Sequence, residues 1–195
     1  TDPVGDLQAM PFPGVLHKYR GRVLLITTGA CGIHCRYCFR RHFPYADANP
    51  APGAWQQALD YIAKDTSITE VILSGGDPLA LADHRLADLA THLAAIPHLK
   101  RLRIHTRLPV VLPERIDTAL LTWLRDSPLQ KVIVIHANHP NEIGADTQQA
   151  MRALRECGIT LLNQSVLLRG INDDAAVLAA LSESLFMAGV LPYYS

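Results

Sequence analysis

The sequence predicts an α/β fold, a partial parallel (β/α)6 TIM-like barrel preceded by an extended N-terminal arm. Short β-branched or leucine-rich runs alternate with longer segments whose apolar residues recur at helical spacing. Such alternation is typical of parallel βαβ units, which either close into a barrel or form an open, doubly wound sheet. Polar residues cluster directly after nearly every predicted strand. This favours the barrel, whose site is built at the carboxyl ends of all its strands, whereas an open sheet uses only its switch point.

The arm is expected to span residues 1–22 and the core residues 23–195. Proline and glycine in the arm exclude a helix or a central strand there, so we expect it to lie across the core. The expected strands are 23–28, 70–74, 99–106, 131–137, 159–168 and 189–194. The expected helices are 53–64, 83–95, 113–126, 146–157 and 173–188. Caps are expected at Asp83, Asp146 and Asp173, and a helix end before Gly158.

The composition indicates one compact, cytoplasmic protein. A chain of 195 residues with 49% hydrophobic content is ample for a single core. Eighteen basic residues balance eighteen acidic ones, so the net charge gives no reason to expect nucleic acid or an acidic membrane as a partner. No apolar run approaches the roughly 20 residues needed to cross a bilayer, and no secretion signal is evident.

Three of the four cysteines form a C-x3-C-x2-C pattern directly after the first predicted strand: Cys31, Cys35 and Cys38. Thiolates are the usual ligands of iron–sulfur clusters, and three of them leave one iron of a [4Fe–4S] cube open to another ligand. The alternative is a zinc site completed by a neighbouring histidine. Cys157 lies on an apolar helical stretch and is expected to be a buried core residue.

Residues 74–78 read Ser-Gly-Gly-Asp-Pro and follow the second predicted strand. Two glycines let a backbone pass close to a ligand, although Gly-Gly-Asp-Pro is also the sequence of an ordinary turn. His136 and Gln164 lie at later strand ends, where each could equally be a satisfied polar core group. The basic loop around Arg40 could be no more than a solvated surface.

The cysteine spacing, the aromatic Tyr37 and the βα array together resemble the radical S-adenosylmethionine (SAM) superfamily. The resemblance implies a barrel of the radical SAM type, with SAM bound to the open iron of the [4Fe–4S] cluster. It also implies a set of SAM-binding residues, namely Tyr37, Ser74, Gly75, Gly76, Asp77, His136 and Gln164.

Longer stretches resemble the lysine 2,3-aminomutase family within that superfamily: 13–19, 35–41, 107–113, 139–143 and 163–170. Residues 38–45 are most similar to the branch that makes β-lysine for elongation factor P. The resemblance implies an isomerase that converts L-α-lysine to β-lysine by 1,2-amino migration, using pyridoxal 5′-phosphate (PLP). It implies that Arg40 binds the substrate carboxylate, and that Lys18, Arg22 and Arg107 surround the PLP phosphate.

In that family the lysine that carries PLP lies beyond the last barrel strand, and we expect this C-terminal segment to be absent from the chain. No catalytic residue beyond the cofactor ligands is therefore expected within it. Implied partners are lysine, a reductant protein such as flavodoxin or ferredoxin, a functional link to elongation factor P, and a second copy in a homo-oligomer. The alternatives are a catabolic lysine or glutamate 2,3-aminomutase, a non-catalytic iron–sulfur electron-transfer protein and a zinc-stabilised module.

Overall fold

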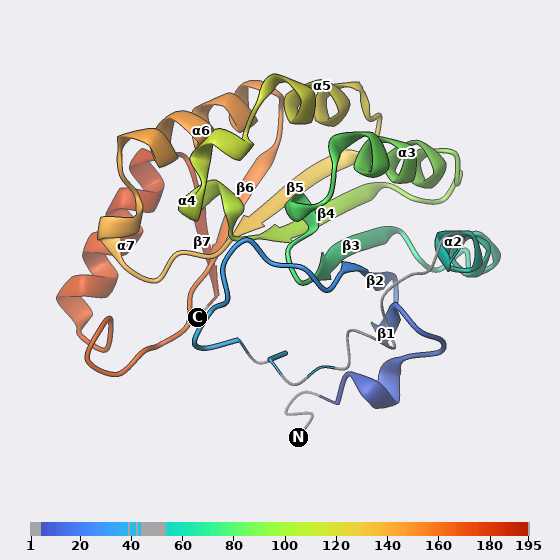
Figure 1. The fold of residues 1–195 in the computed structure, drawn as a ribbon, viewed down its shortest axis with the longest axis horizontal. Coiled ribbons are helices and arrows are strands. Elements are labelled where there is room, and N and C mark those ends of the chain that lie inside the picture. The colour runs from blue at the N-terminus through green and yellow to red at the C-terminus, as the bar shows by residue number, and fades with distance from the viewer. Residues whose placement is uncertain (1–4, 39, 42, 44–53, 195) are drawn as a thin grey trace. The chain divides into compact units, whose positions relative to one another are not determined.

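The structure is a computed structural model that describes residues 5–38, 40, 41, 43 and 54–194. The chain divides into two compact units, one of Thr1–Ile104 with Ser127–Gln130 and one of His105–Asp126 with Lys131–Ser195. Each unit has its own strands and its own covering helices (Figure 1). No helix among the described residues is long and apolar enough to span a membrane.

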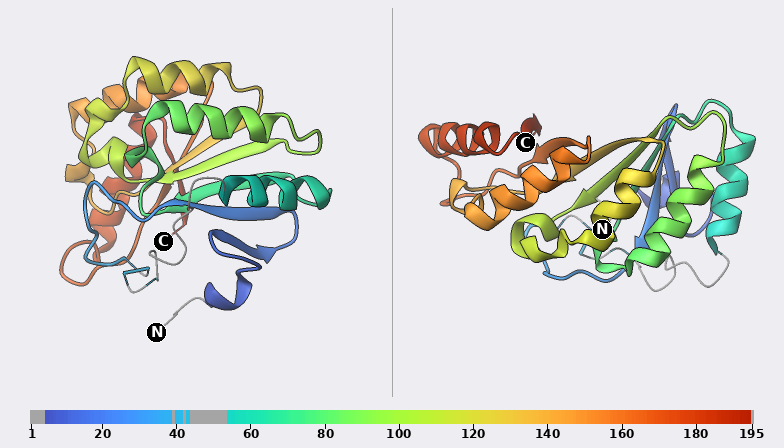
Figure 2. Two further views of the ribbon diagram at one scale, coloured as in Figure 1. Left: turned by 45° about the vertical axis from the view of Figure 1, so that its right-hand side comes forward. Right: turned by 90° about the horizontal axis from the view of Figure 1, so that it is seen from above.

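The first unit is built on β1 (Val15–Tyr19), β2 (Arg22–Thr28), β3 (Glu70–Gly75) and most of β4 (Arg101–Thr106). β1 runs antiparallel to β2, while β2, β3 and β4 are parallel to one another. The unit's helices are η1 (Leu7–Ala9), α2 (Ala54–Lys64), η2 (Pro78–Ala80) and α3 (Asp83–Ala94). α2 and α3 contact each other and lie on one side of β2 and β3 (Figure 2). The core between these layers is mainly apolar, as expected for parallel strands that are covered by helices.

The second unit contains most of β5 (Gln130–Ile135), together with β6 (Thr160–Gln164) and β7 (Leu191–Tyr194), all parallel. Its helices are α4 (Leu108–Val111), η3 (Pro113–Arg115), α5 (Thr118–Asp126), η4 (Pro140–Glu142), α6 (Ala145–Glu156) and α7 (Ala175–Met187). α6 contacts β6, α4 and η3, whereas α7 contacts β7 and η4. The polar loops after β5 and β6 both lie at the carboxyl ends of these strands.

The predicted fold class is confirmed, because six parallel strands alternate with helices along the described chain, as in a partial TIM-like barrel. Each predicted strand is present. The strand expected at 159–168 ends at Gln164, because the following residues turn into a loop that winds around a buried asparagine. The helix expected at 113–126 is broken into η3 and α5, and Asp117 accepts a hydrogen bond from the Leu120 amide at the start of α5.

β1 and α4 were not among the predicted elements. β1 is an edge strand in which Val15 and Leu16 are buried, a role that the Pro-Gly content of the arm does not forbid. Cys157 is buried, as predicted. The boundary between an arm at 1–22 and a core at 23–195 stays a prediction.

The predicted helix caps were largely wrong. Asp83 and Asp146 lie inside the first turn, after the N-cap residue, where a negative charge favours the helix dipole without capping a free N–H. The cap of α7 is Asp174 rather than Asp173, whose carboxylate accepts a hydrogen bond from the Gly170 amide instead. Gly158 does follow α6 and has a positive φ of 74°, as predicted.

Candidate cluster and cofactor site

The three clustered cysteines lie in the loop that leaves the carboxyl end of β2. All three are free thiols of intermediate exposure, and the Cys38 amide donates to the Cys35 carbonyl over 3.1 Å. Burial, followed by the charges of Asp77 and of the other two cysteines, raises the pKa of Cys31 to about 11. The three thiols and Asp77 are therefore close enough to interact electrostatically.

Three cysteine thiols at this spacing are the donor set of an iron–sulfur cluster. Among the described residues no group of three His, Cys, Asp or Glu side chains is arranged to hold one metal ion. In a four-iron cluster each thiolate binds a different iron, so the sulfur atoms stand farther apart than around a single zinc. Cys31, Cys35 and Cys38 would hold such a cluster. Part of the segment 38–45, including His42, lies outside the described residues.

The Ser-Gly-Gly-Asp-Pro loop after β3 is joined to the cysteine loop by two backbone hydrogen bonds. The Gly76 amide donates to the Thr28 carbonyl over 2.7 Å, and the Asp77 amide donates to the Ala30 carbonyl over 2.8 Å. A Cβ atom on Gly76 would lie 2.1 Å from the Ala30 oxygen, so only glycine fits there. The close approach of the two loops thus explains Gly76 before any ligand is considered.

Asp77 and Gly75 hold the rest of this loop in shape. The Asp77 carboxylate accepts from the Leu79 amide over 3.0 Å and caps η2. Gly75 has a φ of 121°, which L side chains rarely adopt. The negative charge of Asp77 also contributes to the raised pKa of Cys31. The Ser-Gly-Gly-Asp-Pro motif is therefore a hydrogen-bonded turn that lies next to the cysteine loop.

A buried carboxylate that sequence reasoning missed organises the basic residues of the first unit. Asp6 is only 4% exposed, and it accepts hydrogen bonds from Lys18 Nζ over 2.8 Å and from Arg40 Nε over 2.9 Å. Arg40 also donates from Nη1 to Ser74 Oγ over 3.1 Å. Two cations assigned by resemblance to different anions are thus held on one carboxylate. No motif pointed to Asp6, because its partners are distant in sequence.

Tyr37 and Arg22 complete the first unit's predicted residues. Tyr37 is half-buried between the second and third cysteines. Arg22 opens β2, at the end opposite to the cysteine loop, and its guanidinium lies over the exposed Tyr19 ring at 5.7 Å. The structure does not bring Arg22 together with Lys18 and Arg40 on Asp6.

The second unit presents its own polar group at the ends of β5 and β6. His136 directly follows β5, and its ring centre lies 5.8 Å from that of His105. Burial, followed by the positive charge of Arg107, lowers the pKa of His136 to about 4. His136 is therefore neutral at physiological pH. Gln164 is the last residue of β6 and is half-buried.

Arg107 is held by Glu142, which sequence reasoning also missed. Arg107 Nη2 donates to Glu142 Oε2 over 2.8 Å, and Glu142 Oε1 accepts from the Asn138 and His139 amides over 2.7 and 3.0 Å. One carboxylate therefore fixes both the arginine that directly precedes α4 and the loop that follows β5.

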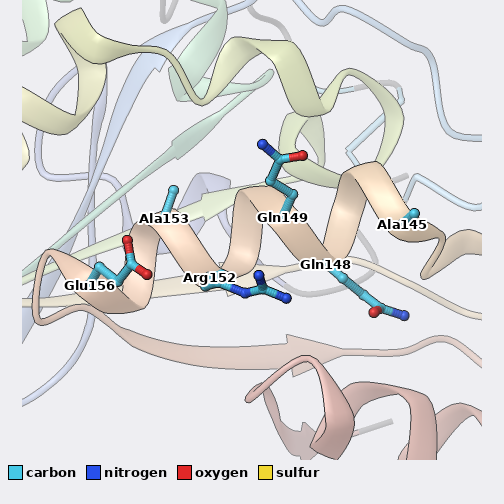
Figure 3. Close-up of a pocket in the computed structure, with 6 residues that line it drawn as sticks. All are labelled: Ala145, Gln148, Gln149, Arg152, Ala153 and Glu156. Carbon is cyan, nitrogen blue, oxygen red and sulfur yellow. The ribbon is translucent and has the colours of Figure 1, made fainter.

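A surface hollow of about 440 Å³ lies elsewhere, along α6. It is lined by one face of that helix, namely Ala145, Gln148, Gln149, Arg152, Ala153 and Glu156 (Figure 3). It contains none of the residues that the sequence motifs single out. The polar groups at the strand ends remain the better candidates for chemistry.

Comparison with known families agrees with this arrangement. The model of the Radical SAM superfamily matches residues 25–181, which is most of the chain. The chain therefore belongs to the radical SAM superfamily, and membership implies a [4Fe–4S] cluster and SAM as cofactors. The radical SAM methyltransferase TsrM from Kitasatospora setae has a similar fold, with a TM-score of 0.59 at 15% identity, over 90% of this chain and 36% of that one. A radical SAM methyltransferase from Sphaerobacter thermophilus gives 0.54 at 16% identity, over 92% and 57%.

Relatives with higher sequence identity point to one family within the radical SAM superfamily. The chain is 57% identical to the L-lysine 2,3-aminomutase of Haemophilus influenzae, over all of this chain and 57% of the relative. It is 54% identical to that of Escherichia coli, over all of this chain and 56% of the relative, and 40% identical to that of Clostridium subterminale, over 99% and 46%. The resemblance to lysine 2,3-aminomutases is thus confirmed. The chain spans about half the length of these relatives.

Proposed function

We propose that this chain supplies the cluster and SAM site of a lysine 2,3-aminomutase, an isomerase that converts L-α-lysine to β-lysine. One observation carries the proposal. Three cysteine thiols follow β2. The loop that bears them is joined by backbone hydrogen bonds to the Ser-Gly-Gly-Asp-Pro loop, in which Gly76 leaves no room for a side chain. The names of the relatives supply the reaction and the substrate.

The proposed ligands are those that the family resemblance implies. Cys31, Cys35 and Cys38 would hold the cluster, and the first unit's Tyr37 and residues 74–77 would contact SAM. His136 and Gln164 of the second unit would contact SAM as well. When bound, the cluster supplies the single electron that starts radical chemistry, and PLP supplies a carrier for the migrating amino group.

His136 suits a site for a cationic cofactor because it carries no charge. A protonated imidazole would repel the sulfonium of SAM, whereas burial keeps this ring neutral and able to donate or accept one hydrogen bond. Its low pKa means that the site keeps this property over the whole range in which the protein would work.

The proposed substrate and PLP contacts rest on arginine and lysine. Arg40, aligned by Asp6, would bind the lysine carboxylate through its planar guanidinium. Lys18 and Arg107 would bind the PLP phosphate, each held by a carboxylate of its own unit. Arg22 is the fourth residue that the resemblance assigns to these anions. It lies at the start of β2, at the end opposite to the cysteine loop.

The test uses the full-length protein, reconstituted anaerobically with iron and sulfide. Dithionite, SAM, PLP and lysine should give 5′-deoxyadenosine and β-lysine. Cys35→Ser should lose iron and both products, whereas Cys157→Ala, outside the triplet, should keep the iron. A brown, loaded protein that leaves SAM intact would refute the proposal and favour an electron-transfer role. A colourless protein that binds one zinc would favour the structural alternative.

A finer proposal is that the β-lysine is made in the cytoplasm for elongation factor P, with a flavodoxin or ferredoxin as reductant. It rests on the similarity of residues 38–45 to that branch, and Phe39, His42 and residues 44–45 lie outside the described part of the structure. Free lysine and free glutamate assayed side by side separate it from a catabolic enzyme. Supplying β-lysine to a strain that lacks the gene should restore modified elongation factor P; continued absence of the modification would contradict this role.

A further inference from the structure

Three buried asparagines of the second unit are not used by the site described so far. Asn138, Asn163 and Asn172 are 3%, 1% and 0% exposed, and they lie after β5, at the end of β6 and in the loop beyond it. We call these three residues the asparagine clamp. A buried amide is costly unless it is hydrogen-bonded, so the bonds that each one makes show what it holds.

Asn163 extends the pairing of β5 and β6 by one peptide. Its backbone is paired with Ile135, the last residue of β5. Its side chain then accepts from the Ala137 amide over 2.9 Å and donates to the Ala137 carbonyl over 3.0 Å. Ser165 Oγ donates to the same carbonyl over 3.1 Å. The peptide that follows His136 is thus fixed by groups on either side of Gln164.

Asn172 joins the two loops beyond that point. Its Oδ1 accepts from the Leu168 amide over 2.6 Å, and its Nδ2 donates to the Asn138 and Val166 carbonyls, both over 2.9 Å. Asn138 Oδ1 accepts from the Val166 amide over 2.7 Å. The Asn172 side chain therefore bonds two backbone groups of the irregular loop after β6 and ties that loop to the loop after β5.

We propose that Asn172 is a positioning residue for SAM, because the clamp ties the loop that begins with His136 to the residues that follow Gln164. The inference rests on the proposed function for the identity of the ligand. Its geometry is independent of any ligand: His136 adjoins the peptide that Asn163 holds, and Gln164 lies between Asn163 and Ser165. Holding both side chains before the ligand arrives removes the cost of ordering them on binding.

The connection between the loops can be separated from the folding of each loop. Asn172→Ala removes all three bonds. Asn172→Asp keeps an acceptor for the Leu168 amide and removes the two donated bonds that reach Asn138 and Val166. Asn141→Ala is the matched control, because Asn141 is an exposed asparagine of η4 whose side chain makes no hydrogen bond given by the structure.

Each variant of the full-length protein is loaded with its cluster, and two quantities are measured well below its melting temperature: the SAM dissociation constant and hydrogen exchange at the Val166 and Leu168 amides. Asn172→Ala should weaken SAM binding about tenfold, with iron content unchanged, and expose both amides to exchange. Asn172→Asp should bind SAM as weakly while the Leu168 amide stays protected. Asn141→Ala should match the wild type in both measurements.

Normal SAM affinity in Asn172→Ala, despite faster amide exchange, would overturn the inference and leave the clamp a purely structural device. If that variant does not fold, Asn138→Ala removes the bond to the Val166 amide and is expected to weaken SAM binding in the same way. A loaded wild type that fails to bind SAM would refute the proposed function instead, and that result is read from the wild type alone.

Discussion

Gly76→Ala tests whether the approach of the two loops in the first unit is what holds the cysteines in place. The new Cβ atom would lie 2.1 Å from the Ala30 oxygen, 2.7 Å from its carbonyl carbon and 2.8 Å from the Gly29 carbonyl carbon. All three are backbone atoms, so no side chain can rotate to relieve the contact. Cβ atoms essentially never approach closer than 3.0 Å, so the loops must separate by about 1 Å.

That displacement breaks the bonds that join the loops. The Gly76–Thr28 and Asp77–Ala30 hydrogen bonds, now 2.7 and 2.8 Å, would both stretch past the range in which such bonds form. Two lost bonds cost about 1 kcal/mol each, and overpacking adds about 1–3 kcal/mol. The free energy of unfolding should therefore fall by about 3–5 kcal/mol, a large fraction of the usual total.

The functional effect should exceed the loss of stability. The Ala30 carbonyl directly precedes Cys31, so its displacement moves a proposed cluster ligand. We expect less iron after reconstitution and about 100-fold slower formation of 5′-deoxyadenosine, a typical result of a shift of about 1 Å in a reacting group. Urea unfolding, iron analysis and a deoxyadenosine assay measure the three effects.

Gly144→Ala is the control, because nothing lies within 4 Å of its added Cβ and its φ is −78°. Its unfolding free energy should fall by about 1 kcal/mol at most, the cost of alanine at the N-cap of α6. Gly76→Ala with normal stability, iron content and rate would show that the loops are free to separate, and the account of the glycine pair would be wrong.

Three further predictions concern charged and titrating groups. Asp6→Asn should raise the KM for lysine about tenfold, because Arg40 loses the charged partner that aligns its Nε; unchanged kinetics would remove Asp6 from the site. The pKa of His136 is about 4 when folded and lies near 6.5 when unfolded, so the unfolded chain takes up more protons and stability should fall as pH drops from about 6.5 to 4. His136→Gln should flatten that slope in urea titrations, and a persistent slope would point to another group. The pKa of Cys31 is raised partly by Asp77, so Asp77→Asn should speed alkylation of Cys31 at pH 8 in the cluster-free protein, as followed by peptide mass; an equal or slower rate would contradict this.

Much of the architecture is readable from local patterns. β2, β3 and β5 are short apolar runs, because both faces of such strands are buried, and α2, α3, α5 and α6 show an apolar stripe at the expected period. The cysteine triplet and the Ser-Gly-Gly-Asp loop could be found because their residues are neighbours in sequence. What these patterns could not give is any interaction between residues that are far apart along the chain.

The missed residues show this limit directly. Asp6 lies 34 residues from Arg40, and Glu142 lies 35 residues from Arg107. Asp6 belongs to no motif, and Glu142 lies in a stretch that resembles the family without a role implied for it, so each looks like an ordinary surface charge in the sequence. Asn172 likewise meets Asn138 across 34 residues. Caps failed for a different reason, since several acidic residues near a helix start compete and only the backbone angles decide which one caps.

The carboxylates beside the two proposed anion-binding arginines allow the effect of net charge on anion binding to be distinguished from the effect of side-chain orientation. In the first unit one buried acid faces Lys18 and Arg40, a group with a net charge of +1, whereas in the second unit Glu142 neutralises Arg107. Coulomb attraction alone would therefore gain from removing the charge of Asp6, because the group would become more positive. Geometry predicts the reverse, since a guanidinium binds a carboxylate in a planar, paired manner only if its orientation is held. A weaker grip on lysine after neutralising Asp6 would mean that placement outweighs charge at this site, while a tighter one would mean that Asp6 restrains the cations rather than presenting them.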